Sequence, residues 1–327
     1  MITRVNSFMK KITLLILFCF PLMAWAQLYA CRDVVKDGYD FWLYVPENYN
    51  VAVKKPVIMF LHGKSLSGND LSLVRRYGCI DAVMRNRQID AIIVAPQTNC
   101  GWNPKKVMDV YDWVKGHYSV DTDRFYVIGM SMGGYGTIDV AATYPDKVAA
   151  AMAMCGGATV SSLCGLNDLP LWIIHGTADN AVPVGCSQTV VDAMCSCGDT
   201  SRLIFDKLKG VNHTRLARIF YLDQTYKWLF SHSLTDSSRM VNRDYTINNA
   251  LMKDAYADLH TNHNIKVLDW NNTEQASAGR RAYIVKKGDT LSKIAVENNT
   301  TVSIICNINK IKKDAKLSVG KKLLLPK

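Results

Sequence analysis

Short apolar runs alternate with helix-like stretches through the middle of the chain. Strand patterns that end at Gly or Pro occur in YDFWLYVPENY, KPVIMFLHG, DAIIVAPQ, RFYVIGM, KVAAAMAMCGG and PLWIIHG. Helical spacing appears after Pro104, in GGYGTIDVAATYPD and over residues 184–194; a last strand, SRLIFDKL, precedes an amphipathic helix over residues 215–230. Apolar strands separated by helices must be covered on both faces. The pattern therefore predicts an α/β fold, a three-layer sandwich around a mostly parallel sheet.

The first 26 residues differ from the rest. Three basic residues precede an uncharged apolar run from Ile12 to Phe20, and the small residues Ala24 and Ala26 follow. This order is typical of a secretory leader, so we expect cleavage after Ala26 and export to the periplasm, the cell envelope or the medium. The run is shorter than the roughly 20 residues of a spanning helix, and no later segment is long and apolar enough to span a membrane.

The polar composition of residues 233–280 predicts a long linker, with a short helix near residues 250–259. Residues 27–232 then form the large domain and residues 281–327 a small one. In the small domain the pattern indicates a strand, two short helices and a closing strand.

The formal net charge of +11 belongs to the two ends of the chain. Residues 1–26 carry +3 and residues 281–327 carry +8, with eleven basic and three acidic residues, so residues 27–280 hold twenty-five charges of each sign. A balanced large domain gives no indication of a nucleic-acid partner.

Nine cysteines follow the leader, a density that permits disulfides in an exported protein. Their pairing cannot be assigned from sequence, and free buried thiols are the alternative. Cys195 and Cys197 are too close in sequence for an easy mutual bridge. No spacing of cysteine and histidine is typical of a zinc site.

Four residues with catalytic chemistry lie beyond the carboxyl ends of predicted strands: His62, Ser131, Asp179 and His213. Ligands of such sheets bind beyond the carboxyl ends of the strands. Ser131 lies in a G-x-S-x-G pattern, Gly129 to Gly133, with a strand before it and a helix after it. This context predicts a sharp turn that raises the serine hydroxyl above the sheet as a nucleophile.

A serine nucleophile needs a base, and the base needs an acid that orients it. For this type of fold the chain order is nucleophile, acid, base. Asp179 and then His213 meet that order, whereas Asp206 lies within a strand and Asp168 precedes one. We therefore predict Ser131, Asp179 and His213 as the catalytic residues, and a structural role for His175.

The backbone N–H groups of Met132 and Lys64 are the predicted oxyanion donors, with Ser65 as an alternative to Lys64. Three further residues at strand ends, His62, Gln97 and Trp102, are candidate substrate-binding residues. An exposed Trp102 could stack on an aromatic acyl group or a sugar; packing in the core is the competing interpretation.

The motifs LHGKSLSG, IGMSMGGYGT, HGTADNAVPV and VNHT, in this order, resemble the α/β-hydrolase superfamily, and within it secreted esterases such as feruloyl esterases, polyhydroxybutyrate depolymerases and dienelactone hydrolase-like enzymes. The resemblance implies hydrolysis of carboxylic esters through an acyl-enzyme without a metal or organic cofactor. It covers about residues 28–232. Lys64 stands where depolymerases and feruloyl esterases often carry cysteine.

The segment YIVKKGDTLSKIA together with VGKKLLLP resembles a LysM domain. That family binds glycans containing N-acetylglucosamine, usually peptidoglycan or chitin. The resemblance implies a βααβ fold and places the glycan near Gly288, Asp289, Thr290 and Leu291. Cys306, where an aliphatic residue is usual, is predicted to be a core residue.

Together these features predict an exported serine esterase that is held on a cell wall by its C-terminal domain, with an ester as substrate and peptidoglycan as partner. Two alternatives stay open: a serine peptidase similar to prolyl oligopeptidases, and a non-catalytic protein that binds peptidoglycan.

Overall fold

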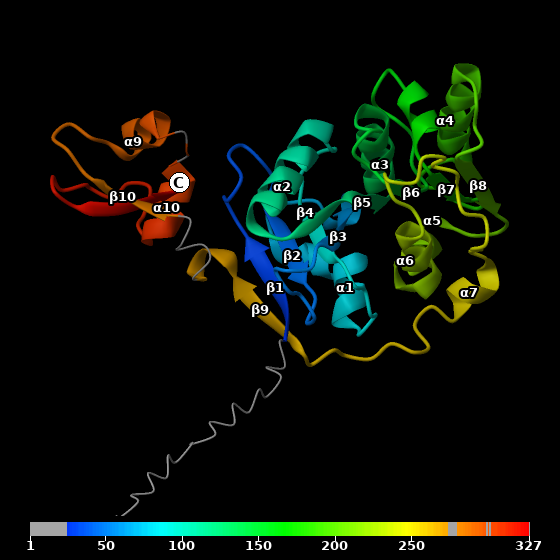
Figure 1. Ribbon diagram of the computed structural model, residues 1–327, viewed down its shortest axis with the longest axis horizontal. Helices are drawn as coiled ribbons and strands as arrows, with labels where there is room; N and C mark the ends of the chain where they lie inside the picture. The colour runs from blue at the N-terminus through cyan, green and yellow to red at the C-terminus, as the bar shows by residue number, and fades with distance from the viewer. Residues whose placement is uncertain (1–24, 274–279, 299, 301, 327) are drawn as a thin grey trace, which may run out of the picture.

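The computed structural model describes residues 25–273, 280–298, 300 and 302–326, so that all but the last two residues of the predicted leader, residues 1–26, lie outside this part (Figure 1). The strands are β1 Ala26–Cys31, β2 Phe41–Val45, β3 Lys55–Leu61, β4 Ile92–Pro96, β5 Val120–Met130, β6 Ala150–Met154, β7 Leu171–Gly176, β8 Leu203–Leu208, β9 Ile265–Asp269, β10 Arg280–Ile284 and β11 Lys322–Pro326. The α-helices are α1 Cys79–Met84, α2 Pro104–His117, α3 Met132–Thr143, α4 Val184–Cys197, α5 His213–Leu216, α6 Asp223–Phe230, α7 Asn249–Lys253, α9 Leu291–Glu297 and α10 Val302–Asn309. The 3₁₀ helices are η1 Lys64–Leu66, η2 Leu71–Arg75, η3 Cys164–Asp168, η4 Ala217–Tyr221 and η5 Trp270–Asn272.

The large domain is built on one sheet with the strand order β8-β7-β6-β5-β3-β4-β2-β1-β9. The strands from β8 to β4 are parallel to one another; β2 runs antiparallel to β4 and β1, and β9 is parallel to β1. β3, β4, β6 and β7 are buried along their whole length. Strands buried on both faces read as continuous apolar runs, which is why the sequence pattern identified them.

Helices cover both faces of this sheet (Figure 1). Apolar residues of α2, α3 and α4 pack on one face and those of α1, α5, α6 and α7 on the other, so that two cores lie on the two sides of the strands. The predicted α/β three-layer sandwich is confirmed.

The helix predicted over residues 215–230 is interrupted. The chain forms α5, then η4, and resumes as α6 after Leu222, whose backbone is extended at φ −84° and ψ 132°. The apolar spacing correctly predicted the buried side, because Phe220, Tyr226 and Trp228 are all buried. It could not predict the break in the helix.

Residues 233–273 belong to the large domain, and the predicted linker over residues 233–280 is wrong for this stretch. β9 extends the sheet beside β1, and Val241, Ile247 and Met252 are buried against the domain. Trp270 is 3% exposed and meets the ring of Trp113 with 5.0 Å between centroids. Few and widely spaced apolar residues do this packing, which explains why composition suggested a linker.

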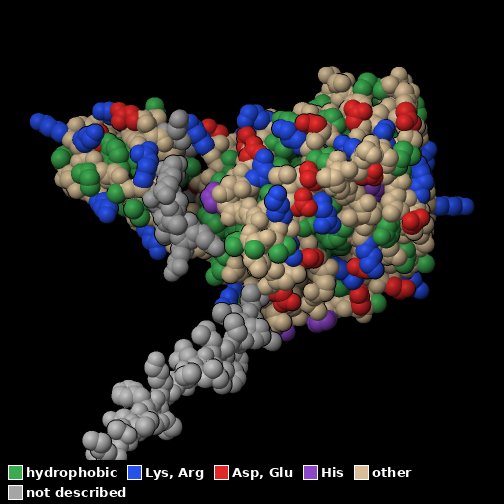
Figure 2. Space-filling model, in the orientation of Figure 1, with side chains coloured by type: hydrophobic (Ala, Val, Ile, Leu, Met, Phe, Trp, Pro, Cys, Tyr) green, Lys and Arg blue, Asp and Glu red, His purple; other side chains and the backbone are tan. Residues whose placement is uncertain are grey.

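The small domain pairs β10 with β11 in an antiparallel ribbon, with α9 and α10 between them in sequence. Its core contains Ile294, Ile305 and Leu323, and also Cys306, as predicted. The βααβ order is confirmed. Figure 2 shows Lys and Arg side chains distributed over the visible face of this domain.

One disulfide, Cys164–Cys197, is found in the described part of the chain and ties η3 to the end of α4. Cys31, Cys79 and Cys155 are buried free thiols. Both interpretations of the cysteines therefore apply, each to a different subset. Among the described residues, every helix is too short or too polar to cross a bilayer.

We expect Trp270→Ala to lower the free energy of unfolding by about 3–5 kcal/mol, since a large buried aromatic ring is removed. Urea denaturation of the full chain measures it. Val267→Ala, an exposed position on β9 (50% exposed), is the matched control and should change stability by less than about 0.5 kcal/mol. Equal small effects of both variants would show that residues 233–273 contribute little to the domain.

Candidate active site

Ser131 stands at the sharp junction of β5 and α3. Its backbone has φ 59° and ψ −124°, in the region that non-glycine residues rarely adopt. Its N–H donates to the carbonyl of Met154 on the neighbouring strand β6 at 2.9 Å. Such strain persists only where the surroundings enforce it, and it lifts the side chain out of the sheet. The predicted turn from strand to helix is present.

Two glycines of the motif allow the backbones to approach. A Cβ added to Gly133 would lie 1.8 Å from the carbonyl oxygen of Leu61 at the end of β3. One added to Gly129 would lie 2.3 Å from the carbonyl oxygen of Gly133. Any side chain at either position would push α3 away from β3, so these positions require glycine.

Asp179 and His213 form a direct pair. One carboxylate oxygen of Asp179 accepts from Nδ1 of His213 at 2.7 Å, and the other accepts from the N–H groups of Ala181 and Val182, both at 2.9 Å. The Asp179 side chain is fully buried, whereas that of His213 is 23% exposed. Burial alone would raise the pKa of Asp179, but the hydrogen bonds from Val182, His213 and Ala181 outweigh it and hold this pKa below its usual value. An ionised Asp179 orients the imidazole and leaves Nε2 of His213 for a reacting group.

The order of the strands brings the serine and the Asp179–His213 pair together at the carboxyl ends of neighbouring strands. Ser131 follows β5, and Asp179 follows β7, with β6 between them. Cys155 follows β6, and its Sγ lies within 4.8 Å of ligand atoms of both Asp179 and His213. The sheet thus collects the three predicted catalytic residues around the end of β6.

In the described part of the chain, one group of side chains has the spacing of a metal site, and it consists of Cys155, Asp179 and His213. Burial, followed by the charge of Asp179, raises the pKa of the Cys155 thiol well above its ordinary value. At neutral pH the group therefore presents a protonated sulfur beside the Asp179–His213 pair.

The predicted oxyanion donors lie at two helix starts. Met132 is the first residue of α3 and Lys64 the first of η1. Within the described residues, neither backbone N–H has a hydrogen-bond acceptor. Both are therefore available to a negatively charged oxygen next to Ser131, as at other helix N-termini.

His62 holds the loop that follows β3 in place. It is fully buried; Nδ1 lies 2.8 Å from the carbonyl oxygen of Gly63 and must carry the proton, while Nε2 accepts from the N–H of Thr98 at 3.1 Å. Burial lowers the pKa of His62 to about 4. Both ring nitrogens are occupied by backbone groups, so the predicted role in substrate binding is wrong and His62 is a structural residue.

Gln97 and Trp102 are also loop supports. The amide of Gln97 donates to the carbonyls of Leu66 and Asp70, both at 2.9 Å. Trp102 is 8% exposed, and its indole N–H donates to the carbonyl of His62 at 3.2 Å. Core packing is therefore the correct interpretation of Trp102, and the predicted stacking on a substrate is not supported. The sequence correctly placed these residues beyond the carboxyl ends of the strands. It could not show whether their side chains face a ligand or the loop.

His175, predicted to be structural, is buried within a polar network. Its Nδ1 lies 2.7 Å from Oγ of Ser187 and its Nε2 2.9 Å from the carbonyl of Val182. Since Val182 also donates to Asp179, this network supports the loop that carries the acid.

Tyr77 reaches the same loop and was missed by sequence reasoning. Its hydroxyl oxygen accepts from the N–H of Gly63 and from Oγ of Ser65, each at 3.3 Å. Tyr77 lies outside the quoted motifs, and nothing in its local sequence indicates this contact.

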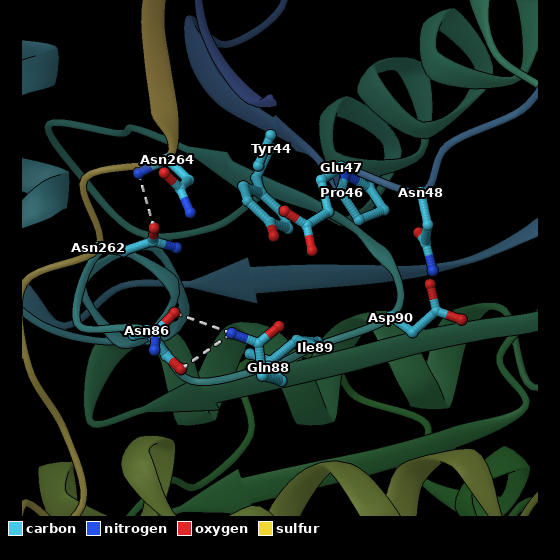
Figure 3. A pocket seen from close by; sticks show the side chains of 11 residues that line it. Tyr44, Pro46, Glu47, Asn48, Asn86, Gln88, Ile89, Asp90, Asn262 and Asn264 are labelled. Atoms are coloured by element: carbon cyan, nitrogen blue, oxygen red, sulfur yellow. Dashed lines mark hydrogen bonds between the residues drawn. The ribbon is translucent and has the colours of Figure 1, made fainter. Parts of the chain in front are cut away.

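A separate polar hollow of about 200 Å³ lies near the amino end of β4 (Figure 3). Tyr44, Asn86, Asn262 and Asn264 are among its lining residues. The predicted catalytic residues follow the carboxyl ends of the strands. This hollow lies at the opposite end of the sheet and is therefore no part of the site.

In the small domain, the four predicted glycan-binding residues have different surroundings. Gly288 is exposed with φ 84°, and Asp289 accepts from the hydroxyl of Tyr283 and the N–H of Lys286, both at 2.8 Å. Thr290 caps α9, while Leu291 is 6% exposed and packs in the core. The exposed turn at residues 288–290 is accessible to a ligand; the side chain of Leu291 is not.

Comparison with known proteins agrees with this architecture. The sequence model of a family described as "Putative esterase" matches residues 107–226, and that of the LysM domain matches residues 283–326. A bifunctional acetylxylan esterase/xylanase of Neocallimastix patriciarum is 26% identical over 155 residues, which is 44% of this chain and 22% of that protein. Acetylxylan esterase A of Emericella nidulans is 40% identical over 58 residues, 18% of this chain and 19% of that protein. The chain thus aligns with about a fifth of the length of these relatives.

Among solved structures, that of a thermostable esterase is similar with a TM-score of 0.54 and 26% identity, over 64% of each chain. The fold and the turn at Ser131 are those of α/β-hydrolases. The large domain is similar to esterases of this fold, and residues 283–326 match the LysM domain.

Protonation of His62 should destabilise the fold in acid. Its folded-state pKa of about 4 lies below the ordinary value of 6.5, so its contribution to stability is complete above pH 6.5 and is lost as the pH falls toward 4. The shift corresponds to about 3 kcal/mol. We expect urea unfolding of His62→Gln to depend less on pH between 6.5 and 4.5 than unfolding of the wild type, while His263→Gln, at an exposed position, leaves the dependence unchanged. A parallel pH profile of His62→Gln and wild type would contradict this.

Proposed function

We propose that this chain is an exported serine carboxylic-ester hydrolase with Ser131 as nucleophile, His213 as base and Asp179 as the acid that orients it. The observation that carries the proposal is the 2.7 Å hydrogen bond from His213 to a buried, ionised Asp179, at the sheet edge where Ser131 is held in its strained turn. The matches to an esterase family and to a thermostable esterase support the same reaction class.

In this mechanism Oγ of Ser131 attacks the ester carbonyl carbon while Nε2 of His213 takes the hydroxyl proton. The carbonyl oxygen becomes negatively charged and accepts hydrogen bonds from the N–H groups of Met132 and Lys64. His213 then gives its proton to the leaving alcohol, and Ser131 is left acylated. A water molecule, deprotonated by His213, attacks the acyl-enzyme and releases the acid, which regenerates the serine.

The substrate we propose is a small acyl ester on a polysaccharide. Two relatives are acetylxylan esterases by name, which favours an acetyl group on a sugar hydroxyl. The exposed turn at Gly288 and the charge of +8 over residues 281–327 suit retention of the enzyme on a glycan with anionic groups. Peptidoglycan is the glycan implied by the LysM match. Export by the leader over residues 1–26 would deliver the enzyme to this substrate.

Replacement of Ser131 by alanine should abolish ester hydrolysis. We expect kcat on p-nitrophenyl acetate to fall about 10⁵- to 10⁶-fold for Ser131→Ala and about 10⁴-fold for Asp179→Asn, since the first removes the nucleophile and the second the orientation of the base. Ser196→Ala, at an exposed serine of α4, is the control and should match the wild type. Turnover by Ser131→Ala at the wild-type rate would overturn the proposal.

The substrate classes can be ranked by kcat/KM on a panel of four substrates: acetylated xylan oligomers, methyl ferulate, p-nitrophenyl butyrate and a peptidyl p-nitroanilide. We expect the highest kcat/KM on an acetyl ester. Preference for the peptidyl substrate would favour a peptidase instead.

Removal of residues 274–327 should separate binding from catalysis. We expect the shortened chain to hydrolyse p-nitrophenyl acetate at the wild-type rate and to remain in the supernatant when peptidoglycan is sedimented. Removal of residues 233–327 also deletes β9 and Trp270 and should lower the unfolding temperature of the remaining domain. Undiminished sedimentation of the 1–273 chain with peptidoglycan would show that the LysM domain is not the binding element.

A further inference from the structure

The hydroxyl of Tyr77 occupies a particular place in the site. Its ring packs in the core, 6.4 Å from the ring centroid of Phe220, and its oxygen emerges at the loop that follows β3. Gly63 and Ser65 both donate to that oxygen. Within the described residues the phenol proton has no acceptor. The phenol proton can therefore be donated to a ligand bound beside this loop.

Gly63 separates this hydroxyl from the nucleophile. A Cβ added to Gly63 would lie 2.8 Å from the Tyr77 oxygen and 3.4 Å from Cβ of Ser131. The hydroxyl and the serine thus border the same small space, which a side chain at position 63 would fill. Lys64, the next residue, provides the backbone N–H that the proposed mechanism assigns to the oxyanion.

We propose that the Tyr77 hydroxyl donates a third hydrogen bond to the oxyanion, beside the backbone N–H groups of Met132 and Lys64. This inference rests on the proposed esterase function and adds a catalytic side chain to it. The two hydrogen bonds that the phenol oxygen accepts polarise its O–H and make it a stronger donor. Burial raises the pKa of Tyr77, so the hydroxyl keeps its proton at neutral pH.

If Tyr77 only supported the loop, its loss would affect catalysis differently from the loss of a hydrogen bond to the oxyanion. A support acts through the position of Gly63, and its loss would slow every substrate equally. A donor acts on the charge that develops on the carbonyl oxygen. Sulfur accepts hydrogen bonds weakly, so a thionoester, with C=S in place of C=O, gains little from such a donor.

The test compares p-nitrophenyl acetate with its thionoacetate analogue in wild type, Tyr77→Phe and Ser196→Ala, using the full chain. We expect Tyr77→Phe to lower kcat on the oxygen ester about 10- to 100-fold, toward the lower end of the loss seen for oxyanion donors, with KM little changed. On the thionoester its loss should be less than about 3-fold, since the acceptor is weak. Ser196→Ala, at an exposed serine of α4, is the control and should match the wild type on both esters.

An equal loss on both esters, or no loss on either, overturns the role of Tyr77. A wild type that is no faster than Ser131→Ala on any ester overturns the proposed function, and with it this inference. An active wild type with an unimpaired Tyr77→Phe overturns the inference alone, so the two failures are distinguishable.

If Tyr77→Phe does not fold, 3,5-difluorotyrosine at position 77 keeps the shape and the hydroxyl but makes the phenol more acidic. We expect the alkaline limb of the kcat–pH profile to move to lower pH, because the donor loses its proton earlier. An alkaline limb that coincides with that of the wild type overturns the proposal.

Discussion

The close approach between the end of β3 and the start of α3 determines the geometry of the whole site. Gly133 lies against the carbonyl of Leu61, and Gly129 lies against Gly133, at distances that exclude any side chain. This contact keeps Ser131 in its strained conformation at the junction of β5 and α3. Since β3 leads directly into the loop with Lys64, the same contact also positions that loop relative to the start of α3, and with it the two proposed oxyanion donors.

The loop after β3 is held by side chains from other elements. Beneath it, His62 joins Gly63 to Thr98, Gln97 ties Leu66 to Asp70, and Trp102 donates to the carbonyl of His62. Tyr77 supports its outer side. The hydrogen bonds of the buried His62, Gln97 and Trp102 hold the loop in place before a substrate binds. Rigid donors lose no energy to reorganisation as charge develops, and this is the main way in which such sites stabilise an oxyanion.

Residues 233–273 show how a polar stretch can be structural. β9 pairs with β1 and packs Ile265 and Leu268 against the two cores, and Trp270 fills the space between β1 and α2 with a single aromatic side chain. A few anchoring contacts at wide sequence intervals are enough to order the chain, because the domain already presents the hollows that they fill. The boundary of the large domain therefore lies later in the chain than composition indicates.

The sequence by itself determined the α/β order, the strand-to-helix turn at Ser131, the order of Asp179 and His213 behind it and the βααβ C-terminal domain. These follow from local patterns: apolar runs for strands buried on both faces, glycine where backbones approach, and a resemblance that extends over contiguous motifs. The tertiary structure alone decided that His62, Gln97 and Trp102 face the loop, that Tyr77 enters the site and that residues 233–273 join the sheet. Each of these depends on contacts between segments far apart in the chain, and the direction in which a side chain points there is set by its neighbours in space.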